Sequence, residues 1–582
     1  MARPKSKRGR RKNVSCNSCR EVGARCAPSR LTCTYYHNKD PQPQNSQTRK
    51  RKRKLKGARD GPLRGIGSQR IALEPPAPIE DESEAEDSTY ADRTIRGASR
   101  FSDRITVSVN DALSDDICID AISIQRRLED AVQWHQHGAR IEDHALACLK
   151  HYMAYLFPNV PLLGERSFSH GLKLVGNLYY QCQWQLLQAD EFHFSRPSVT
   201  PRSDRCNFRL KDISEFCLIT AMCAAVHYLT PECLALPGHE MAPAFLRASR
   251  RMLDLISDLD LKTPTSNSLV TRYLHSLCLR SFGEETLSWH ALGEAIRIAQ
   301  AMRLFDEDSY DGLPEYEAAI RRRVFWQLFT DDRSGALLES RPSAMDMLTT
   351  KPRLTVAALD LEHEPTLTYH AFSAIRTPGL EKQLREGFNL RQTLFGIAMN
   401  LVEELRLAGR YYGDFVEIIW SKIPGRPRRR ITDLYLRFTL ALDKASHAFQ
   451  FVGEVDTTPE GPLMVQTMVV NLWITYHCLH NVILSRYAEA DAVSVLGLSG
   501  EHFAVDSKRY AVGHDLVQVL RNAPNDALLL NGSTCAAMIK EVAASLLDVS
   551  TATDNALLAD QAKIDHDALY VVLSRLVPRT VP

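Results

Sequence analysis

Four of the fourteen cysteines lie within eighteen positions near the start of the chain, between two runs of Lys and Arg. They are Cys16, Cys19, Cys26 and Cys33. A Cys-x2-Cys pair turns two thiolates onto one ion, and two further thiolates complete a tetrahedral zinc site. Residues 14–36 include very few aliphatic side chains, so we expect this segment to fold only around the metal, which contributes on the order of 10 kcal/mol. A disulfide pair is the alternative, but nothing else in the sequence indicates an oxidising compartment.

Charge is segregated along the 582-residue chain, although the net charge is only +2. Residues 1–70 hold 21 Lys and Arg against three acidic residues, and residues 71–92 hold eight acidic residues and no basic one. A basic arm beside a metal knuckle suits phosphate binding, because each neutralised phosphate releases a counterion. The expected DNA-contacting residues are Arg8, Arg10, Arg11, Lys12, Arg20 and Arg25.

A second basic run follows the cysteines, and it predicts nuclear import. It consists of Arg49, Lys50, Arg51, Lys52, Arg53 and Lys54. A solvated charged tail without a partner is the alternative. The run lies in a segment, 37–113, that is rich in Pro, Gln, Ser and charge, and we expect this segment to be a disordered linker. Its acidic stretch, 80–87, suits an activating tail, a partner for the basic head or a solubilising linker.

The cysteine spacing resembles that of the fungal zinc-binuclear-cluster transcription factors. In that family, six cysteines hold two zinc ions and place a short helix in the DNA major groove. Cys16, Cys19 and Cys26 match one half of the cluster, and only Cys33 is left for the other half. The resemblance implies a nuclear, zinc-dependent regulator of RNA polymerase II genes, whose partners are DNA, the transcription machinery and a second copy of the chain.

The match departs from the family pattern at the position that reads bases. Between the second and third cysteines, Val22 and Gly23 stand where the first half of the family cluster carries Lys or Arg. An internal deletion, or an exon missing from the gene model, would explain both this gap and the absent cysteines. The chain as written therefore predicts strong phosphate contacts and little preference among DNA sequences.

From about residue 114 the sequence has helical periodicity, which predicts an all-α fold. A stripe of Ile117, Ala121, Ile124, Leu128 and Val132 recurs at three- and four-residue spacing. We expect it to be buried within the chain, and pairing with a second copy is the alternative. Proline at 158 and 161 is expected to end the following helix. We expect no apolar run to reach the roughly 18 residues that a bilayer span needs.

The centre of the chain resembles the regulatory, or middle homology, domain of the same fungal family. The similarity rests on 289–304, 317–333 and Arg341-Pro342, and it covers roughly 140–490. The helical spacing predicts that Val324, Phe325, Leu328 and Phe329 are buried. The charged residues of the same helix, Arg321, Arg322, Arg323 and Arg333 with Glu317 and Asp332, are expected to form an intramolecular ion-pair network rather than a DNA surface.

The C-terminal part continues as helices. Residues 469–486 predict a central buried helix, on which His477 and His480 are expected to lie in the core rather than bind metal. The stretch 424–430 is interpreted as a basic loop. Cysteines outside the head, such as Cys148, Cys223 and Cys478, are expected to be reduced core thiols.

The sequence argues against an enzyme. Asp331 and Asp332 are adjacent acids, but Gly335 stands where the third carboxylate of a magnesium-binding helix would lie. No phosphate loop, nucleophile elbow or His-Glu-x2-His motif is found in the sequence.

Three parts are predicted: a zinc-binding, DNA-contacting head (1–36), a disordered linker (37–113) and an all-α regulatory domain (114–582). The predicted function is sequence-specific regulation of transcription in the nucleus, for example of a metabolic or secondary-metabolite gene cluster. The alternative is a helical interaction protein that has lost base reading and acts through partners. Neither a membrane nor a specific small-molecule effector is indicated.

We predict one zinc ion per head, because a thiolate-bridged pair of ions requires six sulfurs and only four are present. Native mass spectrometry of residues 1–60 measures this stoichiometry. Two zinc ions, or none while the thiols are reduced, would contradict the prediction.

Overall fold

The computed structural model describes residues 113–135, 140–163, 208–231, 235–345, 379–412, 425–443, 445, 449 and 463–576. Every regular element in these ranges is a helix, which confirms the predicted all-α class. The chain divides into two compact units, Met1–Arg93 and Thr94–Pro582, and all of the described residues belong to the second. The predicted head and almost all of the predicted linker lie outside the described residues.

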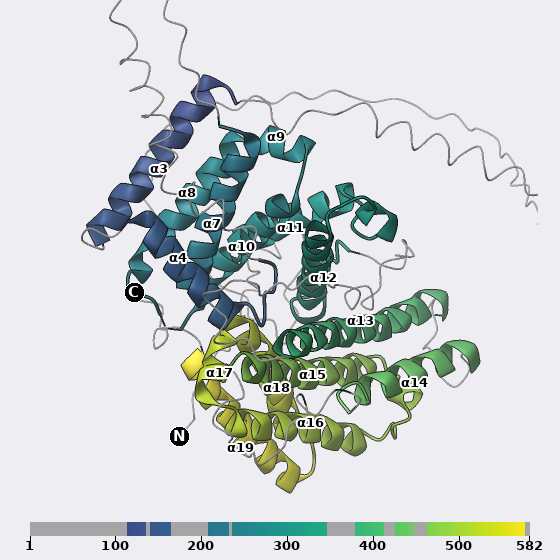
Figure 1. Cartoon of the computed structure of the whole chain (residues 1–582). Helices are drawn as coiled ribbons and strands as arrows, with labels where there is room; N and C mark the ends of the chain where they lie inside the picture. The colour runs from purple at the N-terminus through teal and green to yellow at the C-terminus, as the bar shows by residue number, and fades with distance from the viewer. Residues whose placement is uncertain are drawn as a thin grey trace, which may run out of the picture. The chain divides into compact units, whose positions relative to one another are not determined.

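The first group of helices, purple to teal in Figure 1, encloses one hydrophobic core. Its helices are α3 (Asp115–His135), α4 (Ile141–His151), α7 (Leu210–Leu229), α8 (Ala242–Leu255), α9 (Ser257–Lys262), α10 (Ser266–Ser281), α11 (Glu285–Ala301) and α12 (Glu315–Leu338). A π-helical turn, Tyr152–Leu156, continues α4 and is followed by a turn at 157–159. The helix therefore ends where proline was expected to end it.

Helix α7 lies inside this group, with α4, α8 and α10 packed around it. Every residue from Glu215 to His227 is buried. Among the described helices, α7 is long and apolar enough to cross a membrane, and 83% of its most apolar window is buried inside the fold. The expectation that the chain lacks such a run is therefore wrong for α7. A helix that is apolar all round also suits the interior of a large helical domain.

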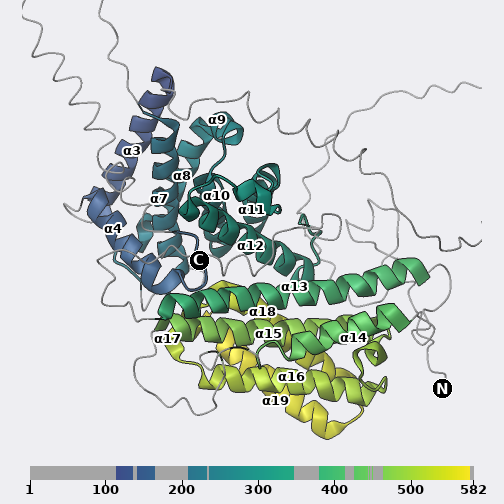
Figure 2. The same cartoon turned by 45° about the vertical axis from the view of Figure 1, so that its right-hand side comes forward.

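The second group, green to yellow, encloses a second core around α15. Its helices are α13 (Leu380–Tyr412), α14 (Gly425–Thr439), α15 (Leu463–Glu489), α16 (His502–Asn522), α17 (Asn525–Leu530), α18 (Gly532–Ala552) and α19 (Ala556–Leu576). Helices α13, α16 and α18 pack against α15, and Figure 2 shows α13 running alongside it. The prediction of a central buried helix at 469–486 is confirmed.

The apolar stripe of α3 is buried within the chain, as expected. Ala121, Leu128 and Val132 have little or no exposed surface, and α3 packs on α8. Trp134, at the end of α3, is 80% exposed. Ile117 and Ile124 are half-buried and pack against the same core, so most of the stripe is covered within the chain.

The basic stretch interpreted as a loop is helical from Gly425 onward, because α14 begins there. Pro427 is tolerated because it lies in the first turn, where a backbone N–H has no partner within the helix. Arg430 then pairs with Glu404 of α13 at 2.8 Å. This segment therefore joins α14 to α13.

Two histidines of α15 lie in the second core, as predicted. The Tyr435 hydroxyl of α14 lies 2.9 Å from Nε2 of His480. Burial, together with the charges of Lys508 and His477, lowers the pKa of His480 to about 3. Burial also lowers the pKa of His477 to about 4. Both rings are therefore neutral at neutral pH.

We expect stability to fall as the pH drops below about 6.5, because unfolding then lets these histidines bind protons that the folded state excludes. The variant His480→Gln removes one of these two proton-binding side chains and keeps a polar partner for Tyr435. Between about pH 5.5 and 4, the unfolding free energy of the unsubstituted chain should fall as the pH falls. The corresponding slope of the variant should be smaller by about 1.4 kcal/mol per pH unit.

Urea unfolding of the whole chain at several pH values measures this slope. The control is His290→Gln, because the His290 side chain is 74% exposed. An unchanged slope in His480→Gln would refute the prediction.

Candidate functional site

The residues predicted to bind zinc, contact DNA and direct import all lie outside the described residues. They are Cys16, Cys19, Cys26, Cys33, Arg8, Arg10, Arg11, Lys12, Arg20, Arg25 and Arg49 to Lys54. The site that the structure describes is therefore in the helical body, beginning with the motif of α11 and α12.

The basic triplet of α12 is held by acidic residues of the same chain. Arg321 Nε donates a hydrogen bond to Oε1 of Glu317 at 2.8 Å, one helical turn earlier. Arg322 Nε donates to Oε1 of Glu307 at 2.9 Å. Arg323 is buried. The predicted intramolecular network is confirmed for the first two arginines, and the triplet does not form an open cationic surface.

The carboxylate of Asp332 holds the segment that follows α12. It accepts hydrogen bonds from Ser343 Oγ at 2.6 Å, Ala344 N at 2.9 Å and Met345 N at 3.0 Å. Arg333 donates to the carbonyl oxygen of Met345 in the same segment. Asp332 was expected to pair with cations of α12. It binds a hydroxyl and two amides instead, because the chain turns back over the end of the helix.

The Arg341-Pro342 motif is positioned by Trp289 of α11. The guanidinium of Arg341 lies 4.7 Å from the centre of the Trp289 ring. A Cβ atom on Gly335 would lie 3.1 Å from Cζ3 of the same ring, so glycine allows α12 to approach α11. The position that would carry a third carboxylate in a magnesium-binding helix is therefore used for packing.

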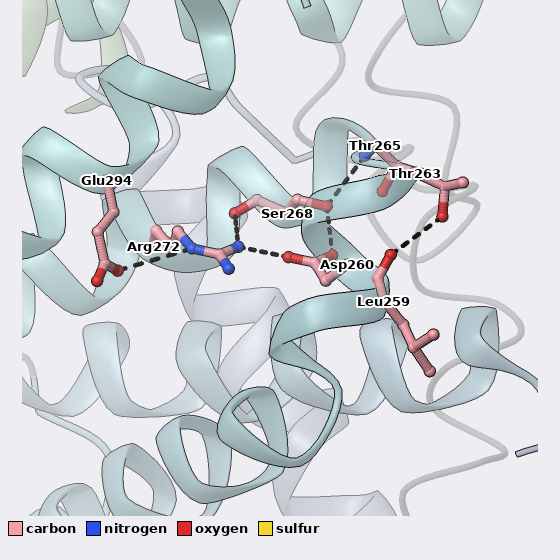
Figure 3. A network of polar contacts seen from close by, with 7 residues as sticks. All are labelled: Leu259, Asp260, Thr263, Thr265, Ser268, Arg272 and Glu294. Atoms are coloured by element: carbon pink, nitrogen blue, oxygen red, sulfur yellow. Dashed lines mark hydrogen bonds and ion pairs between the residues drawn. The ribbon is translucent and has the colours of Figure 1, made fainter. Parts of the chain in front are cut away.

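A buried ion pair connects the short helix α9 to α10. Arg272 Nη1 lies 2.6 Å from Oδ2 of Asp260 and also donates to the carbonyl oxygen of Ser268 at 2.9 Å. Ser268 Oγ donates to Oδ1 of Asp260 at 2.6 Å. Figure 3 shows Arg272 between Asp260 and Glu294 of α11, whose Oε2 lies 3.7 Å from Nε. Three consecutive helices are therefore joined by one network.

Two histidines and a cysteine meet between α4 and α7. His144 Nε2 lies 2.9 Å from His227 Nε2, and Cys148 Sγ lies 3.7 Å from the same nitrogen. All three residues are buried, and their possible ligand atoms lie within 4.8 Å of one another. Cys223 contributes a thiol that is hydrogen-bonded to Cys148. The ring of Phe245, on α8, stacks on both histidine rings.

Comparison with known proteins identifies one part of the chain. Residues 177–358, about a third of the chain, match the model of the fungal specific transcription factor domain. This part of the chain is therefore similar to the regulatory domain of fungal transcription factors. The chain is also similar to the aurofusarin cluster transcription factor aurR2 of Gibberella zeae, with 42% identity over 65 residues. That match spans 11% of this chain and only 10% of the relative's length. No solved structure matches.

The matched model describes a transcription factor domain and not an enzyme, which agrees with the prediction from the sequence. The described part of the matched range runs from α7 to Met345. It therefore contains the α12 motif, the Asp332 contacts and the ion pair of Arg272, so the polar networks above are features of the regulatory domain.

A set of buried polar residues, here called the polar seam, joins the two cores of the regulatory region. Arg391 of α13 donates to Oε1 of Gln327 at 2.7 Å and to the carbonyl oxygen of Asn159 at 3.0 Å. Gln327 in turn donates to the Tyr273 hydroxyl at 2.8 Å. Asn159 Nδ2 donates to Oδ1 of Asn531 at 3.1 Å. Residues from both groups of helices thus share one hydrogen-bonded network.

A groove of about 450 Å³ lies between α16, α17 and α19 in the same region. Its walls are mostly apolar, and they include two cationic side chains. The lining includes Val517, Leu520, Leu528, Leu569, Val572, Arg521 and Arg575.

Sequence reasoning missed the cluster of α4 and α7. Cys148 and Cys223 were predicted only to be buried, reduced thiols, and they are both free and buried. A signal was present, because His144 and Cys148 are four residues apart, as are Cys223 and His227. Such spacing places side chains on one face of a helix. Nothing in the sequence showed that the two faces meet.

We predict that Arg272→Met lowers the unfolding free energy by about 3–5 kcal/mol, because it leaves the carboxylate of Asp260 buried without its cation. The double variant Arg272→Met/Asp260→Asn removes both charges and should recover at least half of this loss. Denaturant unfolding measures both values.

The matched control is Arg486→Met, which breaks an exposed pair with Glu489 and should change stability by less than about 1 kcal/mol. If Arg272→Met behaves like this control, the ion pair does not hold α9 in place.

Proposed function

We propose that this protein is a nuclear, zinc-dependent, DNA-binding regulator of RNA polymerase II genes. In this proposal, the head (1–36) binds zinc and DNA, the linker (37–113) carries the import signal from Arg49 to Lys54, and the remainder (114–582) is regulatory. The observation that carries the proposal is the fungal transcription factor domain at 177–358, in a chain whose first 70 residues are strongly basic.

The charge arrangement of the body supports DNA contact through the head. Arg321 and Arg322 are engaged with acidic residues of the same domain, and Arg323 is buried. Binding DNA through this triplet would first require these ion pairs to be broken. The basic residues of the head are therefore the better phosphate ligands.

The target proposed is a metabolic gene cluster. The relative of Gibberella zeae is described as a transcription factor of the aurofusarin cluster, and the similarity covers a short segment of each chain. Partners would be DNA and the transcription machinery. A homodimer, which the family resemblance implies, would use a surface other than the buried stripe of α3.

The second candidate function is a helical regulator that acts through partners without reading bases itself. The head favours it in one respect, because Val22 and Gly23 offer no donor to base edges where the family carries Lys or Arg. The two candidates differ in whether the chain binds DNA.

We expect the full chain to bind duplex DNA with a steep salt dependence, of slope about −0.9 per phosphate neutralised, and with little preference among sequences. Titrations at several salt concentrations, on random duplexes and on duplexes that contain guanine triplets, measure both properties. The control variant replaces the basic residues at 8–12 and 49–54 with Ala and Ser, and its slope should be much shallower.

No binding to either duplex at low salt would overturn the proposal and favour the partner-only regulator. A strong preference for one duplex would show that Arg20 or Arg25 reads bases, with each bidentate contact contributing about 1–3 kcal/mol.

A further inference from the structure

Helices α4 and α7 each present a histidine and a cysteine four residues apart, in opposite order along the chain. The pairs are His144 with Cys148 and Cys223 with His227. Spacing of four residues puts the members of a pair on one face of a helix. The two helices pack against each other, so two imidazoles and two thiols come together in the interior. We propose that these four side chains form a zinc site in the regulatory region, separate from the cysteines of the head.

The distances are close to those of a tetrahedral zinc site. Bonds of about 2.0–2.1 Å to nitrogen and 2.3 Å to sulfur place two nitrogens about 3.3 Å apart, and a nitrogen and a sulfur about 3.6 Å apart. The two Nε2 atoms are 2.9 Å apart, and Cys148 Sγ lies 3.7 Å from His227 Nε2. A separation of the imidazoles by a few tenths of an ångström admits the ion. His144, Cys148 and His227 form the group whose ligand atoms lie within 4.8 Å of one another. Cys223 is hydrogen-bonded to Cys148 but lies outside that group, so its thiol would have to turn towards the histidines to become the fourth ligand.

The protonation of the cluster also suits a cation. Burial opposes ionisation of Cys148, but hydrogen bonds from Cys223, His144 and His227 outweigh it, so the pKa of this thiol lies well below its usual range. Burial and the neighbouring Cys148 sulfur raise the pKa of Cys223 well above its usual range. The two Nε2 atoms, 2.9 Å apart, need one proton between them.

Zinc binding gives a neutral buried site. The ion would take four bonds, two from thiolates and two from neutral imidazoles, and any protons that the two sulfurs still carry would be released to solvent. The two negative charges then balance Zn²⁺, so no net charge is enclosed where Phe245 and the apolar side chains of α7 exclude water. The site would join α4, at the edge of the first core, to α7, the central helix of that core.

Two other arrangements make different predictions. A purely hydrogen-bonded cluster would contain no metal. Oxidation by a peroxide would join Cys148 and Cys223 in a disulfide and transfer two electrons to the peroxide, which would lower the chain mass by two hydrogens. The zinc proposal requires both thiols to be reduced and bound.

The test uses the full chain with Cys16, Cys19, Cys26 and Cys33 changed to Ser, so that zinc in the head does not contribute and failure of the head proposal is scored separately. Because the cluster is buried, zinc is measured by plasma mass spectrometry after expression and again after refolding with one equivalent of Zn²⁺. About one zinc per chain is expected. Adding His227→Ala or Cys148→Ser should remove it, whereas the buried-thiol control Cys478→Ser should keep it.

Cobalt(II) gives a readout that does not depend on the variants folding. Refolding the chain that lacks the head cysteines with Co²⁺ should produce the intense visible bands of a tetrahedral site and a sulfur-to-cobalt charge-transfer band. A chain with native circular dichroism that binds neither ion would overturn the proposal. So would copper in place of zinc, or a Cys148–Cys223 disulfide in the chain isolated from reducing cells.

Discussion

The guanidinium of Arg391 is a cation enclosed where two hydrophobic cores meet. Burial lowers its pKa, the nearby carboxylate of Asp331 opposes this effect, and oxygen atoms accept its hydrogen bonds. Gln327 and the Asn159 carbonyl provide them, and both belong to the first group of helices, whereas Arg391 belongs to the second. Breaking this contact would leave a buried cation without acceptors, which is far more costly than losing an equal area of apolar contact. The geometry between the cores is therefore set by directional bonds.

Each core in turn depends on one helix that is apolar all round. Such a helix is stable only when neighbours cover every face, and α7 and α15 are surrounded in this way. The charges of α12 accordingly pair within the chain, Arg321 with Glu317 and Asp332 with backbone amides of the following segment. This pairing also keeps the arginines of the α12 triplet engaged within the body, which supports the proposal that the head contacts DNA.

The sequence predicted the elements whose signal is local. The stripe of α3, the buried face of α12 and the central helix α15 follow from periodicity, because a helix that buries one face repeats apolar residues at three- and four-residue spacing. Contacts between residues far apart in the sequence could not be predicted in this way. The periodicity of α12 shows that Asp332 is near the buried face, but it does not show that residues 343–345 fold back onto its carboxylate. Local spacing predicted that Asp332 pairs with cations of α12, and this prediction was wrong.

Buried polar groups are concentrated in the first core and at the polar seam. Asp260 with Arg272, the histidines and cysteines of α4 and α7, and Arg391 each require fixed directions and distances. Apolar packing tolerates sliding, but a buried hydrogen bond or ion pair is either made or left unsatisfied at a cost of several kcal/mol. A helical body built in this way has few alternative arrangements of its helices, because sliding one helix past another would leave these buried groups unsatisfied.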